Sequence, residues 1–201
     1  MFKKSKLLLF TSATFAIGCL NILIYWRSKD TLHEAILIFA ECARNSGRTA
    51  AALNLFIIAL LIIWRLNKID TSATKKLLFQ LSLFMFAINH VIHFYFVSKN
   101  FEIHNWSVGI SDNLHGFITY LLILIAPVIA LFYRSLNHLL YAFFILHIIN
   151  VTYFIGISFY GRIKPIDPAY MHQIGILIMF ASILLMLTEI FKNWSKEFKQ
   201  E

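Results

Sequence analysis

Charged residues are scarce in this chain of 201 residues, since Asp, Glu, Lys and Arg make up only 14% of it. Soluble domains contain about 25% of these residues, so the composition excludes a soluble globular fold. Two cysteines are too few for a disulfide scaffold, and seven glycines with three prolines exclude a collagenous or low-complexity chain. The chain instead has 59% apolar and 16% aromatic residues, including 20 phenylalanines. This composition predicts an all-α integral membrane protein.

Six long apolar runs set the expected architecture. A helix needs about 20 apolar residues to cross the hydrocarbon core of a bilayer, and the charged residues of this chain concentrate between runs of that length. We therefore expect a single transmembrane domain, residues 1–201, folded as a six-helix bundle. Arg134 and Ser135 form a very short junction, which predicts an antiparallel hairpin around it. The predicted helices span residues 7–26, 48–65, 77–98, 114–133, 136–157 and 170–191.

The connection over residues 27–47 is too long for a turn. Its apolar residues Leu32, Ile36 and Phe39 fall on one face of a helix, with acidic and basic residues elsewhere. This pattern predicts a short amphipathic helix on the outer membrane surface.

The basic residues indicate the orientation of the chain. If the N-terminus is cytoplasmic, 11 of the 18 Lys and Arg residues lie on the cytoplasmic side and the remaining seven lie outside. Cytoplasmic loops carry the excess of Lys and Arg, so both termini are predicted to be cytoplasmic. Short basic clusters between apolar runs are topology signals and predict no nucleic acid partner. The expected surroundings are the lipid bilayer of a cell membrane, the inner membrane if the source is bacterial.

The first apolar run has a second reading. Lys3, Lys4 and Lys6 before an apolar stretch are also typical of a signal peptide. Because the stretch continues to Trp26 without a polar start of a mature chain, we interpret it as a retained helix.

Three histidines fall at membrane depth, where ionisable residues are costly and are functional candidates. His90 lies ~21 Å along its helix from residue 76, and His147 lies ~16 Å along its helix from residue 136, at 1.5 Å per residue. With these orientations the two histidines share one depth. Two neutral imidazoles on neighbouring helices can ligate a b-type haem, or they can simply hydrogen-bond across a helix pair. The phenylalanines that would line a haem slot are Phe86, Phe94, Phe143, Phe144 and Phe154.

Other polar residues have open roles at such a site. His93, three residues after His90, could contact a haem propionate, donate a hydrogen bond to a ligand, or ligate iron in place of His90. His138 precedes His147 by nine residues and is turned by ~180° around the helix, so it cannot serve the same site from the same face. Arg48 could pair with a propionate or snorkel to headgroups. A solvated histidine is expected at the helix ends and outer connections, at His33, His104, His115 and His172.

Several motifs carry a family resemblance. Ser46-Gly47-Arg48-Thr49-Ala50 is followed by Lys75-Lys76-Leu77-Leu78, by Phe86-Ala87-Ile88-Asn89-His90 and by Asn137-His138-Leu139-Leu140-Tyr141. Over residues 44–157 the chain resembles the ferric reductase-like transmembrane family, and most nearly its MsrQ type, the haem-bearing membrane subunit of periplasmic methionine sulfoxide reductase. The resemblance implies a haem b cytochrome that passes electrons to an extracytoplasmic reductase partner or ferric substrate.

The chain also departs from this family. Two-haem relatives space paired histidines 13 or 14 residues apart, whereas Leu77 and Arg134 stand 13 residues before His90 and His147, so the inner ligand pair is absent. The MsrQ type has its two histidines of the fifth helix 13 residues apart, but His138 and His147 are nine apart. Which of these two corresponds to the family ligand stays open, and alignment on Tyr141 puts the outer position at Asn150.

The source of electrons and the activity of the chain itself are open at this point. The sequence has no G-x-G-x-x-G or Walker-type loop, so a quinol in the bilayer or a separate cytoplasmic flavoprotein is the expected electron donor. Whether the chain is itself an oxidoreductase is undecided. The alternatives are a histidine-dependent proton or metal transporter and a structural membrane subunit without chemistry.

Overall fold

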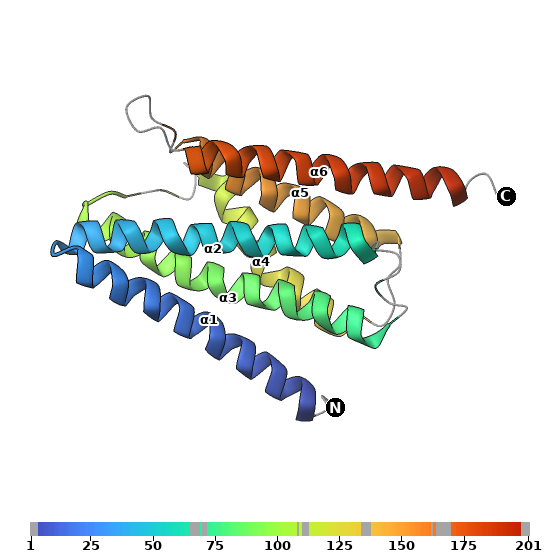
Figure 1. The fold of residues 1–201 in the computed structure, drawn as a ribbon, viewed down its shortest axis with the longest axis horizontal. Helices are drawn as coiled ribbons and strands as arrows, with labels where there is room; N and C mark the ends of the chain where they lie inside the picture. The colour runs from blue at the N-terminus through green and yellow to red at the C-terminus, as the bar shows by residue number, and fades with distance from the viewer. Residues whose placement is uncertain are drawn as a thin grey trace. The chain divides into compact units, whose positions relative to one another are not determined.

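The structure, a computed structural model, describes residues 4–64, 69, 72–107, 109, 113–133, 138–161, 163 and 170–197. Within these residues the chain forms six α-helices and no β-strand (Figure 1). By length and composition, all six can cross a membrane, as in a multi-pass membrane protein. The prediction of an all-α chain with six such helices is confirmed, and the Arg134–Ser135 junction lies outside the described residues. The helices are α1 (Lys4–Thr31), α2 (Ala35–Trp64), α3 (Ala73–Ile103), α4 (Leu114–Phe132), α5 (His138–Tyr160) and α6 (Tyr170–Glu197).

Four of the helices are at least six residues longer than predicted. Helices α1, α2, α3 and α6 contain 28, 30, 31 and 28 residues. At a rise of 1.5 Å per residue they are about 42–46 Å long, which exceeds the roughly 30 Å hydrocarbon core of a bilayer. Their ends therefore reach the headgroup region, where polar side chains are solvated.

The segment at residues 27–47 differs from the prediction of a separate amphipathic helix. Helix α1 continues to Thr31 and α2 begins at Ala35, so residues 35–47 form the first part of α2. No proline interrupts this segment, and its charged side chains pair along the helix. Glu41 accepts hydrogen bonds from both Arg44 and Asn45. Because these side chains are paired, the backbone stays helical through a polar stretch that hydropathy alone assigns to a connection.

Contacts divide the chain into two units, which are described separately. Unit 1 comprises Met1–Leu53 and Gln80–Leu131, and unit 2 comprises Asn54–Phe79 and Phe132–Glu201.

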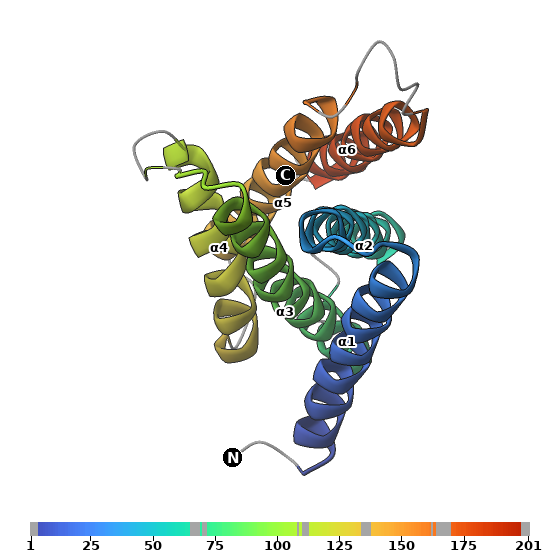
Figure 2. The same ribbon diagram turned by 90° about the vertical axis from the view of Figure 1, so that its left-hand side faces the viewer.

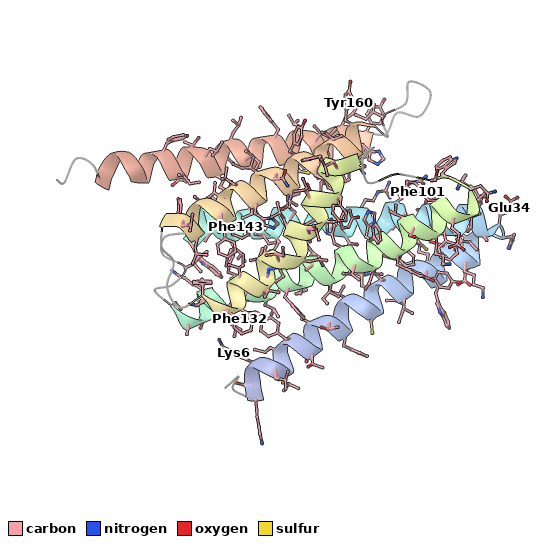
Figure 3. All side chains as sticks on the ribbon, turned by 180° about the vertical axis from the view of Figure 1, so that it is seen from behind. Lys6, Glu34, Phe101, Phe132, Phe143 and Tyr160 are labelled. Atoms are coloured by element: carbon pink, nitrogen blue, oxygen red, sulfur yellow. The ribbon has the colours of Figure 1, made fainter. Side chains whose placement is uncertain are left out.

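Unit 1 is built on α1 and α3, which run in the same direction. Phe10 meets Phe84 edge to face at 4.9 Å between ring centroids, and further along the two helices Tyr25 packs against a core that contains Phe96. Figure 2 views this unit from the end at which α1 joins α2. In Figure 3, Glu34 and Phe101 lie at that end and Lys6 at the opposite one. The buried core at this end consists of Ile38, Cys42, Ala43 and Phe96.

Helix α3 ends in a Schellman motif. Asn105 has a positive φ of 54°, the Trp106 N–H donates to the Phe101 carbonyl at 3.0 Å, and the Asn105 N–H donates to the Glu102 carbonyl at 3.1 Å. The Trp106 ring packs against Phe101 and stacks on His104, with centroids 5.8 and 4.3 Å apart. These contacts satisfy the last carbonyl groups of the helix and place an aromatic cluster where membrane proteins concentrate Trp and Tyr.

Unit 2 contains α5 packed against α6, the orange and red helices of Figure 1. A Cβ atom at Gly175 would lie 2.9 Å from the ring of Phe159, so only glycine allows this approach of the two helices. The Asn54 side chain of α2 donates to the Thr152 hydroxyl of α5 at 2.8 Å. Phe79 of α3 meets Phe144 of α5 edge to face at 5.2 Å.

The Schellman motif can be tested at Asn105. Asn105→Gly should leave stability unchanged, because glycine adopts a positive φ freely. Asn105→Val should lower the free energy of unfolding by about 1–2 kcal/mol, because a β-branched residue is far less tolerant of the left-handed region than asparagine. Thermal unfolding in detergent, followed by circular dichroism, measures both. Equal stability of the two variants would contradict the role assigned to Asn105.

Candidate functional site

A chain of buried polar groups links three helices of unit 1. The Asn21 side-chain nitrogen donates to Asn89 Oδ1 at 3.1 Å, and the Asn89 side-chain nitrogen donates to the Ser46 carbonyl oxygen at 3.0 Å. These three residues are at most 2% exposed. A polar group without a partner is costly in a dry interior, so these bonds hold α1 and α2 on α3.

His93 extends this chain through its ring. Ser46 Oγ lies 2.9 Å from His93 Nδ1 and 2.7 Å from the Cys42 carbonyl oxygen. The direction of the bond between the hydroxyl and His93 depends on the tautomer of His93. In the tautomer with the proton on Nδ1, His93 donates to the hydroxyl and keeps its lone pair on Nε2, as a ligand or a proton acceptor requires.

His90 lies beside His93 inside unit 1. It is 2% exposed, and its ring centroid is 4.3 Å from that of Phe86, 6.0 Å from that of His93 and 5.6 Å from that of Tyr120 on α4. Phe86 is thus a neighbour, as predicted. Phe94 is 55% exposed and contacts Tyr120. Tyr120 is an aromatic neighbour that sequence reasoning missed, because it comes from a different helix.

His147 occupies an apolar position in unit 2. It is 4% exposed, and Phe143 stacks nearly parallel to it, at 6.0 Å and an interplanar angle of 5°. Among the described residues, no hydrogen-bond partner lies near its Nδ1 atom. Phe144, predicted as part of the same aromatic slot, is buried against Phe79. His147 is therefore a buried imidazole between aromatic rings and apolar helix surface.

Of the remaining predicted site residues, Arg48 is half-buried in the middle of α2 and His138 lies at the start of α5. Arg48 donates to Asn45 Oδ1 at 3.1 Å. Asn45 in turn donates to Glu41, so the three side chains form a row of hydrogen bonds along α2. His138 is the first residue of α5, but its side chain lies outside the described part of the chain.

The expectation of a solvated histidine is wrong for His172. This residue is 7% exposed and meets Phe159 edge to face at 5.2 Å. Gly175, one turn further along α6, lets the two helices approach closely enough for Phe159 to cover His172. A glycine inside an apolar helix was the available signal for this contact. Elsewhere in the described residues, no group of three or more His, Cys, Asp and Glu side chains is arranged to hold a metal ion.

No protein-family model, curated protein or solved structure matches the chain.

The link between Asn21 and Asn89 is measurable as a coupling energy. Unfolding of Asn21→Ala, Asn89→Ala and the double variant in mixed detergent micelles forms a double-mutant cycle. We expect a coupling of about 0.6–1.7 kcal/mol, the range of interhelical hydrogen bonds in membranes. Thr11→Ala is the control, because its hydroxyl bonds only to its own helix. A coupling of zero would contradict the role of this bond in joining α1 to α3.

Proposed function

We propose that the chain is a membrane b-type cytochrome, an electron-transfer subunit of the ferric reductase-like or MsrQ-like kind, with both termini cytoplasmic. The observation that carries this proposal is the burial of two imidazoles, His90 and His147, on helices of membrane-spanning length beside aromatic rings. An imidazole inside a membrane-spanning segment is unfavourable unless its ring nitrogens are paired with a polar group, a metal ion or a cofactor.

The donor set suits haem b. The porphyrin supplies four ligands to the iron, so the protein needs to supply only one or two, and buried histidine is the common choice. His90 and His147 are the proposed axial ligands. Haem b, when bound, takes up and releases one electron at a time.

The neighbouring residues fix how these ligands are presented. The bonds of Asn89 to α1 and α2 hold the turn of α3 that carries His90. Phe143 restricts the ring of His147 by stacking on it. His93, in the tautomer that keeps its lone pair on Nε2, is the substitute ligand closest to His90. Arg48 can exchange Asn45 for a propionate, because a charge-assisted bond to a carboxylate is stronger than one to an amide.

The direction of electron flow follows from the proposed orientation. The histidines then lie in the middle-to-outer part of the bilayer, so electrons leave to an extracytoplasmic reductase partner or ferric ion. A quinol diffuses within the bilayer and can approach this depth. It is therefore the favoured donor over a cytoplasmic flavoprotein, for which no inner haem ligands bridge the distance. The proposed location is the cell membrane, the inner membrane in a bacterium.

The visible spectrum of the detergent-purified chain tests this function. A reducible Soret and α band is expected, which a transporter or a structural subunit would lack. His90→Ala should abolish haem binding, and His147→Ala should abolish it or leave a five-coordinate iron. His138→Ala should leave the spectrum intact, as should His115→Ala, an exposed histidine that serves as control. Loss of haem in His138→Ala with no change in His147→Ala would show that His138 is the ligand.

Haem retention tests Arg48 separately. Arg48→Ala should release haem faster than Arg48→Lys, because lysine keeps the charge but loses the bidentate geometry. Arg44→Ala is the matched control, since Arg44 is paired with Glu41 on the same helix. Haem transfer to apomyoglobin measures the release rate. Equal rates for Arg48→Ala and Arg44→Ala would remove Arg48 from the site.

A further inference from the structure

A cavity of about 370 Å³ lies in unit 1, between α1, α2 and α3. Its inner part is apolar apart from Asn21, and its outer part is aromatic. Gly18 leaves open space in this wall, because no atom lies within 4 Å of a Cβ atom built there. The lining residues on which the argument depends are Gly18, Ile22 and Tyr25 of α1, Phe39 of α2, and Ile92 and Tyr95 of α3.

On both helices that carry a tyrosine of the cavity wall, a lysine follows that tyrosine by four residues. Lys29 follows Tyr25 by four residues on α1, and Lys99 follows Tyr95 by four residues on α3. Residues four apart lie on one face of a helix. Because α1 and α3 run in the same direction, both lysines stand one turn beyond the aromatic end of the cavity. The cavity thus changes from mainly apolar to aromatic along its length, and the two lysines follow one turn beyond its aromatic end.

The length of this gradient matches half a bilayer. Eleven residues separate Gly18 from Lys29, which corresponds to about 16 Å along the helix. Half of the hydrocarbon core is about 15 Å thick. Tyrosine concentrates at the membrane interface and lysine at the level of the headgroups.

We propose that this cavity binds one acyl chain of an anionic phospholipid whose phosphate contacts Lys29 and Lys99. Basic pockets between transmembrane helices bind anionic headgroups in this way. Lys99 is paired with Glu102 at 2.7 Å, with the two side chains 39% and 65% exposed. An exposed pair of this kind is weak, so a phosphate can displace the carboxylate. Asp30, adjacent to Lys29, and Glu34 are further acidic groups at this end.

The cavity is too small to enclose a transmembrane helix. Such a helix is a cylinder about 10 Å across and about 30 Å long, or roughly 2,000 Å³. The cavity is far smaller and lies in the range of sites for a single small ligand or chain, about 300–1,000 Å³.

Native mass spectrometry of the full chain in a mild detergent tests the proposal. The probes are palmitoyl-oleoyl phosphatidylglycerol and, separately, palmitoyl-oleoyl phosphatidylcholine. One copy of phosphatidylglycerol should bind with at least tenfold higher affinity than phosphatidylcholine. The double variant Lys29→Gln/Lys99→Gln should lose this preference, and Gly18→Leu should weaken the binding of both lipids by filling the cavity.

Two matched controls should behave as the wild type. Lys6→Gln/Lys192→Gln removes the same charge, and Lys192 pairs with Glu189 three residues away as Lys99 does with Glu102. Gly156→Leu adds the same side chain at a glycine of α5 that also has open space beside it.

Three outcomes would overturn the proposal. They are equal affinity for the two lipids, an unchanged preference in the lysine double variant, and a second copy of the chain bound in place of lipid. Lys29 is exposed and the Lys99 side chain is 39% exposed, so the lysine variants decide the question even if Gly18→Leu fails to fold. Lipid binding is measured independently of haem. The result for the lipid proposal therefore does not depend on whether the cytochrome proposal is correct.

Discussion

Polar groups inside the hydrocarbon region must find partners within the protein, because no water is present to bind them. In unit 1 the bonds that run from Asn21 through Asn89 and Ser46 to His93 meet most of this constraint, and Asn21 Oδ1 is buried without a partner among the described residues. The apolar contacts around them determine how closely the helices pack, but lipid tails offer similar contacts to any apolar face. The polar bonds therefore determine which faces meet, and with them the position of His90 in the interior of the unit.

The number of helices and the centre of each could be predicted, because both depend on runs of apolar residues alone. The helix ends could not. Lys29 and Asp30 interrupt the hydropathy of α1 but not its backbone hydrogen bonds, so the helix continues to Thr31. In the same way, Glu41, Arg44 and Asn45 satisfy one another on α2, and the helix runs through a segment that looks like a surface connection.

The candidate site was predictable only where it depends on one helix. Counting residues places His90 and His147 within long apolar helices, and both side chains are buried in helices of membrane-spanning length. Tyr120 and the covering of His172 by Phe159 depend on contacts between helices. A single sequence does not reveal such contacts, except through small residues such as Gly175 that permit close approach.

Ser46 of α2 makes two hydrogen bonds to α3, and these bonds differ in what they require of residue 46. Asn89 binds the backbone carbonyl of Ser46, a group that every residue type supplies, whereas His93 binds the hydroxyl. A small replacement at position 46 would therefore keep the bond from Asn89 between α3 and α2, but it would lose the bond from the hydroxyl to His93. A change at position 89 has no such tolerance, because only its own side chain reaches both neighbouring helices. A position that contributes only a backbone group to a hydrogen bond between helices therefore tolerates substitution, whereas a position that contributes the side chain does not.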